Sequence, residues 1–207
     1  HRGLQSAVGD PRMTTLLFSG GVDSLALAWW RRPDWLLTVD YGQVTAESEV
    51  EVSSVFAGML GIRHDIVRFD LSSVGSGTLA GRGSLELSSF AEWWPNRNQF
   101  MITIGAAWSL GRGVDRLWIG TVKSDACFAD GTPAFIDGMN RVVSMQEGAV
   151  VVEAPASALE TWELVEKSGL PLDYLLLCHT CTMSVKPCGH CRSCGKHRDI
   201  LERFSLI

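Results

Sequence analysis

The stretch Ser19-Gly20-Gly21-Val22-Asp23-Ser24 joins the first apolar run of the chain, residues 14–18, to a helix-like segment that extends to Arg31. Its two glycines permit backbone conformations in which successive amides point toward one centre. The free amides of the opening helical turn, the Ser24 hydroxyl and the helix dipole would add to such an anion site. No lysine follows the glycines, so this is not the loop of P-loop ATPases. An ordinary Gly-Gly turn with Asp23 or Ser24 as N-cap is the alternative.

The rest of the chain alternates short apolar runs with segments of helical periodicity. This alternation predicts an α/β fold, a doubly wound and mainly parallel sheet with helices on both faces. Ligands bind such sheets beyond the carboxyl ends of the strands, where the Ser-Gly-Gly segment lies. Residues 72–95 break the pattern and are expected to form a binding loop or lid. The expected strands are 14–18, 35–39, 66–69, 116–120 and 150–152, and the expected helices are 24–31, 47–60, 98–110, 134–145 and 159–167.

The composition favours a folded protein without a membrane span. Hydrophobic residues make up 46% of the 207 positions and charged residues 20%, which supplies a core and argues against disorder. The net charge of -5 argues against a broad basic face, so we expect no direct nucleic-acid binding. No apolar run approaches the roughly 20 residues of a membrane helix. We divide the chain into a disordered arm or vector remnant (1–12), an α/β domain (13–177) and a cysteine-rich tail packed on that domain (178–207).

Five of the six cysteines fall in the last 30 residues, with spacings typical of a metal site rather than of a disulfide scaffold. Four thiolates would hold a tetrahedral Zn²⁺ and leave no position for a catalytic water, so we expect a structural site in a cytoplasmic protein. A redox or sulfur-carrier role for Cys178 and Cys181 is the alternative. Cys127 stands apart, and we expect it to be a small buried hydrophobe. We favour Cys181, Cys188, Cys191 and Cys194 as ligands, with Cys178 as the competing first ligand and His179, His190 and His197 as substitutes.

The loop and the cysteines belong to a longer ordered pattern. The Ser-Gly-Gly-x-Asp-Ser loop resembles the pyrophosphate loop of the ATP-pyrophosphatase superfamily, whose members cleave ATP to AMP and pyrophosphate. From Met13 onward the chain resembles one branch of it, the 7-cyano-7-deazaguanine synthases, which implies a Rossmann-like ATP-pyrophosphatase fold. This resemblance rests on the order and spacing of Ser19–Ser24, Tyr41–Gln43, Asn96–Asn98, Gly120–Asp125 and Cys181–Cys194.

The resemblance implies a ligase that uses ATP, Mg²⁺ and a structural Zn²⁺. Such synthases adenylate the carboxyl of 7-carboxy-7-deazaguanine, add ammonia to give an amide, and use a second ATP to form the nitrile. Two segments depart from the family. Val44-Thr45 stands where the family has Arg-His, and residues 129–132 (Ala-Asp-Gly-Thr) keep only the Asp of a Tyr-Pro-Asp-Cys-Arg segment. Similar proteins in bacterial antiviral operons attach the deazaguanine to a protein amine, so a protein acceptor is the alternative to ammonia.

The resemblance also implies roles for single residues. The loop would hold the pyrophosphate and Mg²⁺. Arg97 and Asn98 would bind the carboxylate or the α-phosphate, unless they only cap a helix and supply a surface cation. Lys123 would offset charge near the acyl-adenylate, unless it is a solvated surface lysine. The expected catalytic residues are Asp23, Ser24, Arg97 and Lys123. The expected nucleotide-binding residues are Ser19, Gly20, Gly21, Val22, Asp23, Ser24, Asp40, Tyr41 and Gly42. The expected substrate-binding residues are Gln43, Trp94, Arg97, Asn98, Asp125 and Asp130.

Other hypotheses remain beside the leading one. Trp93-Trp94 would stack on a base or else pack in the core, and exposed aromatic surface there would suit a homodimer. A tRNA thiolase of the same superfamily is a second function, against which the acidic charge counts. A third is a nucleotide-binding protein without catalysis, against which the intact loop counts.

Overall fold

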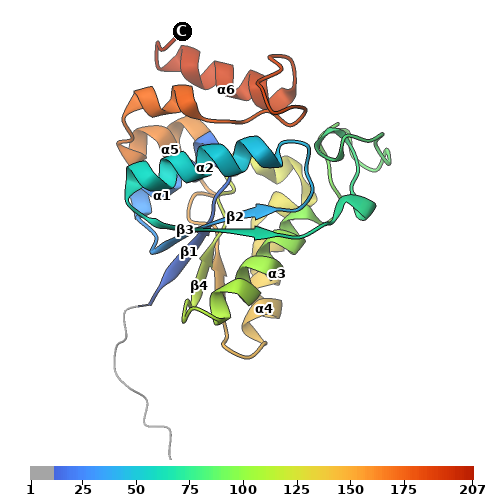
Figure 1. The fold of residues 1–207 in the computed structure, drawn as a ribbon, viewed down its shortest axis with the longest axis vertical. Helices are drawn as coiled ribbons and strands as arrows, with labels where there is room; N and C mark the ends of the chain where they lie inside the picture. The colour runs from blue at the N-terminus through green and yellow to red at the C-terminus, as the bar shows by residue number, and fades with distance from the viewer. Residues whose placement is uncertain (1–11) are drawn as a thin grey trace, which may run out of the picture.

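The structure is a computed structural model and describes residues 12–207, so the expected arm lies outside the described residues except for Arg12. Five parallel strands form one sheet in the order β3-β2-β1-β4-β5, with helices on both faces (Figure 1). The strands are β1 (Thr14–Leu17), β2 (Trp35–Asp40), β3 (Arg63–Arg68), β4 (Arg116–Trp118) and β5 (Val151–Glu153). The helices are α1 (Val22–Arg31), α2 (Ala46–Leu60), α3 (Arg97–Leu110), α4 (Pro133–Ser144), α5 (Thr161–Ser168) and α6 (Arg192–Arg203). The fold class predicted from the sequence is confirmed.

The order of the strands creates the place where a ligand can bind. From β1 the chain proceeds outward to β2 and β3, then returns to the other side of β1 to add β4 and β5. Connections on opposite sides of β1 run in opposite directions along the sheet, which leaves a crevice at the carboxyl ends of β1 and β4. The 19–24 loop follows β1 directly and therefore lies at this crevice.

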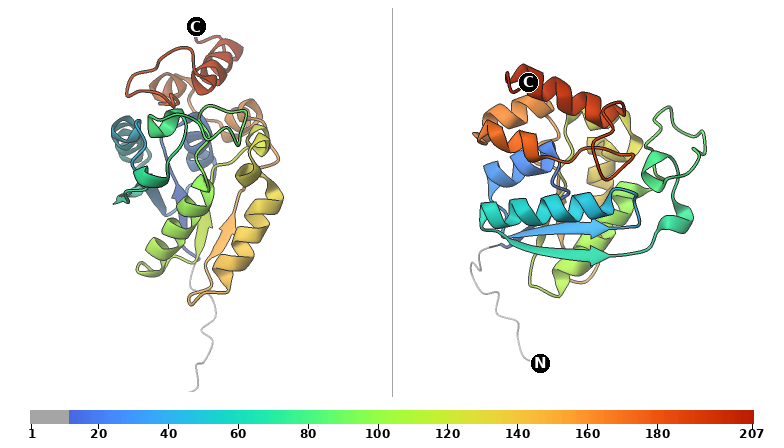
Figure 2. Two further views of the ribbon diagram at one scale, coloured as in Figure 1. Left: turned by 90° about the vertical axis from the view of Figure 1, so that its right-hand side faces the viewer. Right: turned by 45° about the horizontal axis from the view of Figure 1, so that its top comes forward.

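Each face of the sheet is covered by its own set of helices, as both views of Figure 2 show. On one face α1, α2, α5 and α6 pack together, with Leu25, Leu164 and Ile200 in the shared core. On the other face α3 and α4 cover β4 and β5 through Ile102 and Ile136. Burial on both faces explains why the inner strands β1 and β2 together consist mostly of apolar residues.

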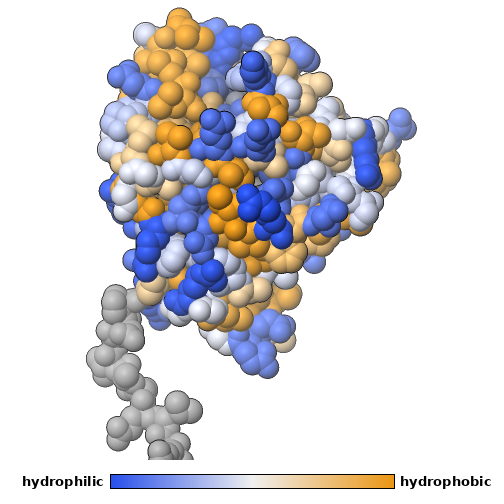
Figure 3. All heavy atoms as spheres, in the orientation of Figure 1, coloured by the Kyte–Doolittle hydropathy of each residue, from blue (hydrophilic) through white to orange (hydrophobic). Residues whose placement is uncertain are grey.

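The last helix, α6, is absent from the sequence-based expectations, which assign its residues only to the cysteine-rich tail. It packs on the same core as α1, because Ile200 is buried there. Apolar side chains also reach the surface near the C-terminal end of the chain, at the top of Figure 3. Within residues 12–207, no helix is both long enough and apolar enough to cross a bilayer.

The irregular segment 72–95 contains two short 3₁₀ turns, Ser72–Val74 and Thr78–Ala80, and otherwise no helix or strand. Trp94, at its end, is 2% exposed, and its ring meets that of Tyr41 edge to face with centroids 4.9 Å apart. The buried Trp94 thereby anchors the segment to the sheet beside the carboxyl end of β2.

Candidate active site

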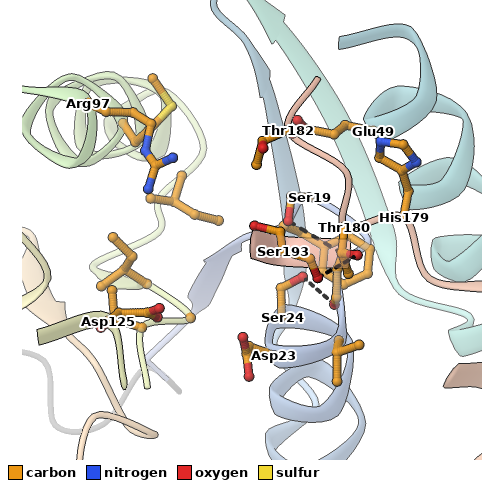
Figure 4. Close-up of a pocket in the computed structure, with 18 of the residues that line it drawn as sticks. Ser19, Asp23, Ser24, Glu49, Arg97, Asp125, His179, Thr180, Thr182 and Ser193 are labelled. Atoms are coloured by element: carbon orange, nitrogen blue, oxygen red, sulfur yellow. Dashed lines mark hydrogen bonds between the residues drawn. The ribbon is translucent and has the colours of Figure 1, made fainter. Parts of the chain in front are cut away.

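A cavity of about 330 Å³ opens at the carboxyl ends of β1, β2 and β4 (Figure 4). The 19–24 loop and the start of α1 form one side, and the start of α3 with the turns after β4 forms the side that faces it. The tail that carries the cysteines forms a third wall. Of the residues expected in the site, those that line the cavity are Ser19, Gly21, Val22, Asp23, Ser24, Tyr41, Arg97, Asn98 and Asp125.

The loop leaves the first amides of α1 free for a ligand. Gly21 is the N-cap, no side chain caps this end, and the Ser24 hydroxyl donates back to the Gly21 carbonyl at 3.1 Å. Asp23 and Ser24 therefore do not act as N-caps, contrary to the alternative considered from the sequence. Gly20 has φ +74°, and a Cβ there would lie 2.8 Å from Val52 Cγ1 on α2, so this position requires glycine. An uncapped helix N-terminus at a cavity is a site for an anionic group.

Asp23 on the loop side and Asp125 on the facing side bring two carboxylates to the cavity. Lys196 lies between them, with its Nζ 3.2 Å from Asp23 Oδ2 and 3.9 Å from Asp125 Oδ1. Burial raises the pKa of Asp23, and Lys196 opposes this shift. Asp23 Oδ1 is buried without a hydrogen-bond partner. An unpaired buried carboxylate oxygen is costly unless a cation occupies the site. The pair of carboxylates thus fits Mg²⁺, whose ligands are oxygens.

Arg97 places a cation on the opposite side of the cavity, at the first residue of α3 (Figure 4). Burial works against its charge, but Tyr41 and the carboxylates of Asp130, Asp125 and Glu49 raise its pKa, so the guanidinium stays protonated. The fork of N–H donors suits a carboxylate or a phosphate. The cavity therefore presents free helix amides at the loop and a guanidinium at Arg97, two groups whose chemistry suits anions.

Glu49 lines the cavity from α2 and is absent from the residues expected from the sequence. Its carboxylate accepts hydrogen bonds from Thr45 Oγ1 at 2.6 Å and from Gln43 Nε2 at 3.3 Å. Gln43 in turn accepts the Tyr41 amide at 2.9 Å, so it supports Glu49 and the β2 end from behind the cavity wall. Only the short spacing between Gln43, Thr45 and Glu49 in the sequence could have indicated this network.

We expect Glu49→Gln to stabilise the protein at pH 8 and to lose this advantage as the pH falls toward 5. Burial raises the pKa of Glu49, so the folded state holds the proton more tightly than the unfolded chain. The contribution of protonated Glu49 to the stability of the fold is complete below its pKa in the unfolded chain, about 4.3. That contribution is lost as the pH rises through the higher pKa of Glu49 in the folded protein. Glutamine imitates the protonated form at every pH.

Thermal unfolding of both proteins between pH 5 and pH 8 tests this expectation. Glu47→Gln, at an exposed position of the same helix, is the matched control and should show no such trend. A Glu49→Gln protein that is less stable than wild type at pH 8 would contradict the burial argument.

The cysteine-bearing tail supplies the third wall through His179, Thr180, Thr182, Ser193 and Lys196. His179 is 7% exposed, its Nε2 has no hydrogen-bond partner, and burial lowers its pKa, which favours the neutral ring. These residues are far from the 19–24 loop in the sequence, and only the folding of the chain brings them next to it. Lys196, for example, is 173 positions from Asp23 in the chain, so no sequence pattern connects them.

Four cysteine side chains converge at the base of this tail. The Sγ atoms of Cys181, Cys188, Cys191 and Cys194 all lie within 4.8 Å of one another. Those of Cys188 and Cys194 are 3.9 Å apart, close to the roughly 3.8 Å edge of a tetrahedron with metal–sulfur bonds of 2.3 Å. The amides of Cys191 and Cys194 donate to the sulfurs of Cys188 and Cys191 at 3.3 Å each. The structure thus brings together the four cysteines expected from the sequence, in an arrangement that could hold a metal ion.

The electrostatics of the cluster also fit a cation. Burial opposes ionisation of Cys181, but hydrogen bonds from the Met183 amide and its neighbours lower its pKa to about 6. Burial and the nearby Cys191 raise the pKa of Cys194 to about 12. Four thiolates so close together repel one another unless a metal ion balances them. All four donors are protein thiols, an arrangement typical of structural metal sites.

Cys178, the competing first ligand, lies outside the cluster. Its thiol donates to the Tyr174 carbonyl with 3.6 Å between Sγ and O, and burial raises its pKa to about 12. This disfavours the thiolate that a redox or sulfur-carrier role would need. Cys127 is exposed rather than buried as expected, because it lies on a surface turn beside Arg192, whose Nη2 is 3.4 Å from its Sγ.

Comparison with known families agrees with this geometry. The family model described as "Queuosine biosynthesis protein QueC" matches residues 13–204. The chain belongs to the QueC family. Curated relatives include 7-cyano-7-deazaguanine synthase 1 of Desulfitobacterium hafniense (strain Y51), 27% identical, where the match covers 90% of this chain and 90% of the relative. Another is 7-cyano-7-deazaguanine synthase of Methanosarcina barkeri (strain Fusaro / DSM 804), 30% identical over 86% of this chain and 88% of the relative.

Among solved structures, the U34-tRNA thiolase NcsA from Methanococcus maripaludis with its [4Fe-4S] cluster matches 98% of this QueC-family chain and 68% of its own. The TM-score is 0.55 and the sequence identity is 17%. This likeness shows a shared fold, the same arrangement of sheet and helices, and no more.

Several residues that the QueC resemblance assigns to the site do not line the cavity. The side chain of Lys123 is 64% exposed and lies 3.4 Å from Glu160 Oε1, so it is the solvated surface lysine of the alternative interpretation. Trp94 packs against Tyr41 in the core and is not available to stack on a base from the cavity. Trp93 is only partly exposed, which leaves little aromatic surface for the expected homodimer contact.

Asp40 and Asp130 do not line the cavity of this QueC-family protein either, and both stabilise the backbone next to it. Asp40 lies 3.6 Å from Arg68 at the edge of the sheet and accepts the Gly42 amide at 3.2 Å. Asp130 Oδ2 accepts the Asn98 amide at 3.1 Å, and Asn98 Nδ2 donates to the Asp130 carbonyl at 2.8 Å. Asp130 therefore holds the start of α3, where it fixes Arg97 next to the cavity.

Proposed function

We propose that the protein is an ATP-dependent carbon–nitrogen ligase that adenylates the carboxylate of 7-carboxy-7-deazaguanine and transfers the acyl group to an amine. The observation that carries this proposal is the uncapped Ser-Gly-Gly-Val-Asp-Ser turn facing Arg97 across one cavity. A triphosphate needs the first of these ends and a carboxylate needs the second. Membership of the QueC family and relatives named as 7-cyano-7-deazaguanine synthases support the same reaction.

In this reaction a carboxylate oxygen of the substrate attacks the α-phosphorus of ATP, and pyrophosphate leaves. The loop amides and Ser24 bind the departing pyrophosphate, and Arg97 orients the attacking carboxylate. Asp23 and Asp125 would hold Mg²⁺, which neutralises charge on the phosphates. The amine then attacks the carbonyl carbon of the acyl-adenylate, and AMP departs. The four-cysteine site would hold Zn²⁺ as a structural ion, and we place the reaction in the cytoplasm.

We propose ammonia as the amine, with the amide converted to the nitrile by a second ATP. The relatives' names support the nitrile product, because they are 7-cyano-7-deazaguanine synthases. A protein amine is the second candidate, and one observation favours it. Val44-Thr45 stands where the family resemblance leads us to expect Arg-His. Thr45 is buried and donates a hydrogen bond to Glu49, and Val44 is 37% exposed. The segment that follows β2 therefore lacks two basic side chains. A peptide acceptor needs an open approach, whereas ammonia needs none.

Substrate-dependent exchange of labelled pyrophosphate into ATP tests the adenylation without any amine present. We expect exchange with Mg-ATP and 7-carboxy-7-deazaguanine, none without the acid, and none in Asp23→Ala. Mass spectrometry after adding ammonium or a candidate protein then separates amide and nitrile from conjugate. Wild-type protein that is folded and metal-loaded but shows no exchange would overturn the proposal. Exchange or AMP release that requires tRNA would favour the thiolase instead, and ATP binding without turnover would favour an inactive binder.

A further inference from the structure

Lys196 lies inside the cavity although it belongs to the cysteine-bearing tail. Its ammonium contacts Asp23 on the loop side and Asp125 in the turn after β4, at 3.2 and 3.9 Å. Its side chain is 31% exposed, so it is neither a core residue nor a surface lysine. A single cation from the end of the chain therefore bridges two carboxylates that follow different strands.

The four-cysteine cluster fixes the position of this ammonium. Helix α6 starts after Cys191, whose sulfur accepts the Cys194 amide, and Lys196 follows Cys194 by two residues on the same helix. Further along the helix the core holds α6 in place, because Ile200 is buried and His197 Nε2 lies 2.8 Å from the Leu175 carbonyl oxygen. A metal bound by the cysteines would thus act on the cavity through one and a half turns of helix.

The charges around the cavity show what Lys196 could bind. Among the described residues that line it, the side chains with fixed positive charge are Arg97, Arg192 and Lys196. Arg97 projects from the side opposite the loop (Figure 4). Arg192 pairs with Glu92 at 3.3 Å and lies over the Phe90 ring, 4.8 Å from its centroid. Lys196 is the cation beside the loop, where two carboxylates would otherwise repel an incoming polyphosphate.

We propose that Lys196 binds the pyrophosphate portion of ATP and that the four-cysteine metal site holds it in position to do so. This inference rests on the proposed use of ATP in this cavity. On binding, the ammonium moves from Asp23 to the phosphate oxygens, which leaves both Asp23 oxygens for a cation. Lys196 keeps its proton throughout and acts by charge alone.

Binding of ATP, pyrophosphate and AMP to the full-length, metal-loaded protein tests the first half of the proposal. In Lys196→Met the Kd values of ATP and pyrophosphate should rise about 10- to 100-fold, as for loss of a charged hydrogen bond, while that of AMP stays unchanged. Lys196→Arg should recover part of the affinity. Lys186→Met, exposed between the cysteines of the same tail, is the matched control and should bind all three as wild type. Equal weakening of ATP and AMP, or of neither, would overturn the role.

Removal of the metal by a chelator tests the second half, with circular dichroism to confirm that the sheet domain stays folded. Metal loss should weaken ATP binding more in wild type than in Lys196→Met, because in wild type it removes the Lys196 contact in addition to the rest of the tail wall. Equal additional weakening in both proteins, or full affinity without metal, would overturn the link.

Failure of the proposed function and failure of the role of Lys196 give different results in these experiments. Lys196-dependent ATP binding without exchange on 7-carboxy-7-deazaguanine would leave Lys196 in place and overturn only the substrate. Wild-type protein that binds neither ATP nor pyrophosphate would overturn both.

Discussion

Arg97→Met should lower the rate of 7-carboxy-7-deazaguanine-dependent pyrophosphate exchange by about 10²- to 10³-fold, the range for loss of one preorganised donor to developing charge. The guanidinium is the fixed cation at the end of the cavity opposite the loop, and Asp130 secures the helix start from which it projects. Its loss leaves the substrate carboxylate without a partner and Glu49 without a nearby cation. We therefore expect the KM for the acid to rise along with the fall in kcat.

Two controls separate binding from folding in this experiment. Arg112→Met removes a guanidinium just beyond the same helix, where it pairs with Asp65 at 2.9 Å, and should leave the exchange rate unchanged. The Kd of pyrophosphate should also stay near the wild-type value in Arg97→Met, because the loop end of the cavity is intact. An Arg97→Met protein that is folded and exchanges at the wild-type rate would remove Arg97 from the site.

Cys191→Ser should abolish metal binding and unfold the tail. Serine is a good N-cap, so the start of α6 keeps its cap while the cluster loses one thiolate. Structural metal sites contribute on the order of 10 kcal/mol to folding, more than a segment as small as residues 178–207 can replace with its own core. We expect the metal content to fall from one ion per chain toward zero and the α6 amides to lose their protection from hydrogen exchange.

Cys127→Ser is the matched control for this substitution, because Cys127 is exposed and lies outside the cluster. It should retain one metal ion per chain and the wild-type melting temperature. If Cys191→Ser also retained its metal and melted with wild type, the cluster would not be the metal site.

Features encoded by neighbouring residues were predictable from the sequence. Every expected strand and helix is present, with ends that shift by a few residues, because burial on two faces leaves short apolar runs for strands and a 3.6-residue period for helices. The spacing of the cysteines indicated a metal site, and the structure brings together the four that we favoured from the sequence, without Cys178. The 19–24 turn lies at the cavity because its position follows directly from the strand before it.

Features that depend on distant contacts were not predictable. Lys196 and His179 line the cavity although they lie far from the 19–24 loop in the sequence, and nothing in their sequence neighbourhood indicates a nucleotide site. Lys123 shows the opposite case. It follows β4 as expected, but its backbone N–H bonds to the Leu159 carbonyl and its side chain turns outward to Glu160. A one-dimensional pattern places a residue near a strand end, and it does not show which way the side chain points.

The tail wall has a consequence for the order in which the protein is made. Synthesis delivers the loop at residues 19–24 long before the residues of α6, yet both border the same cavity. A nascent chain on the ribosome can therefore fold its sheet while the nucleotide pocket still lacks one side. The pocket is complete only once α6 has been made and has packed against the core.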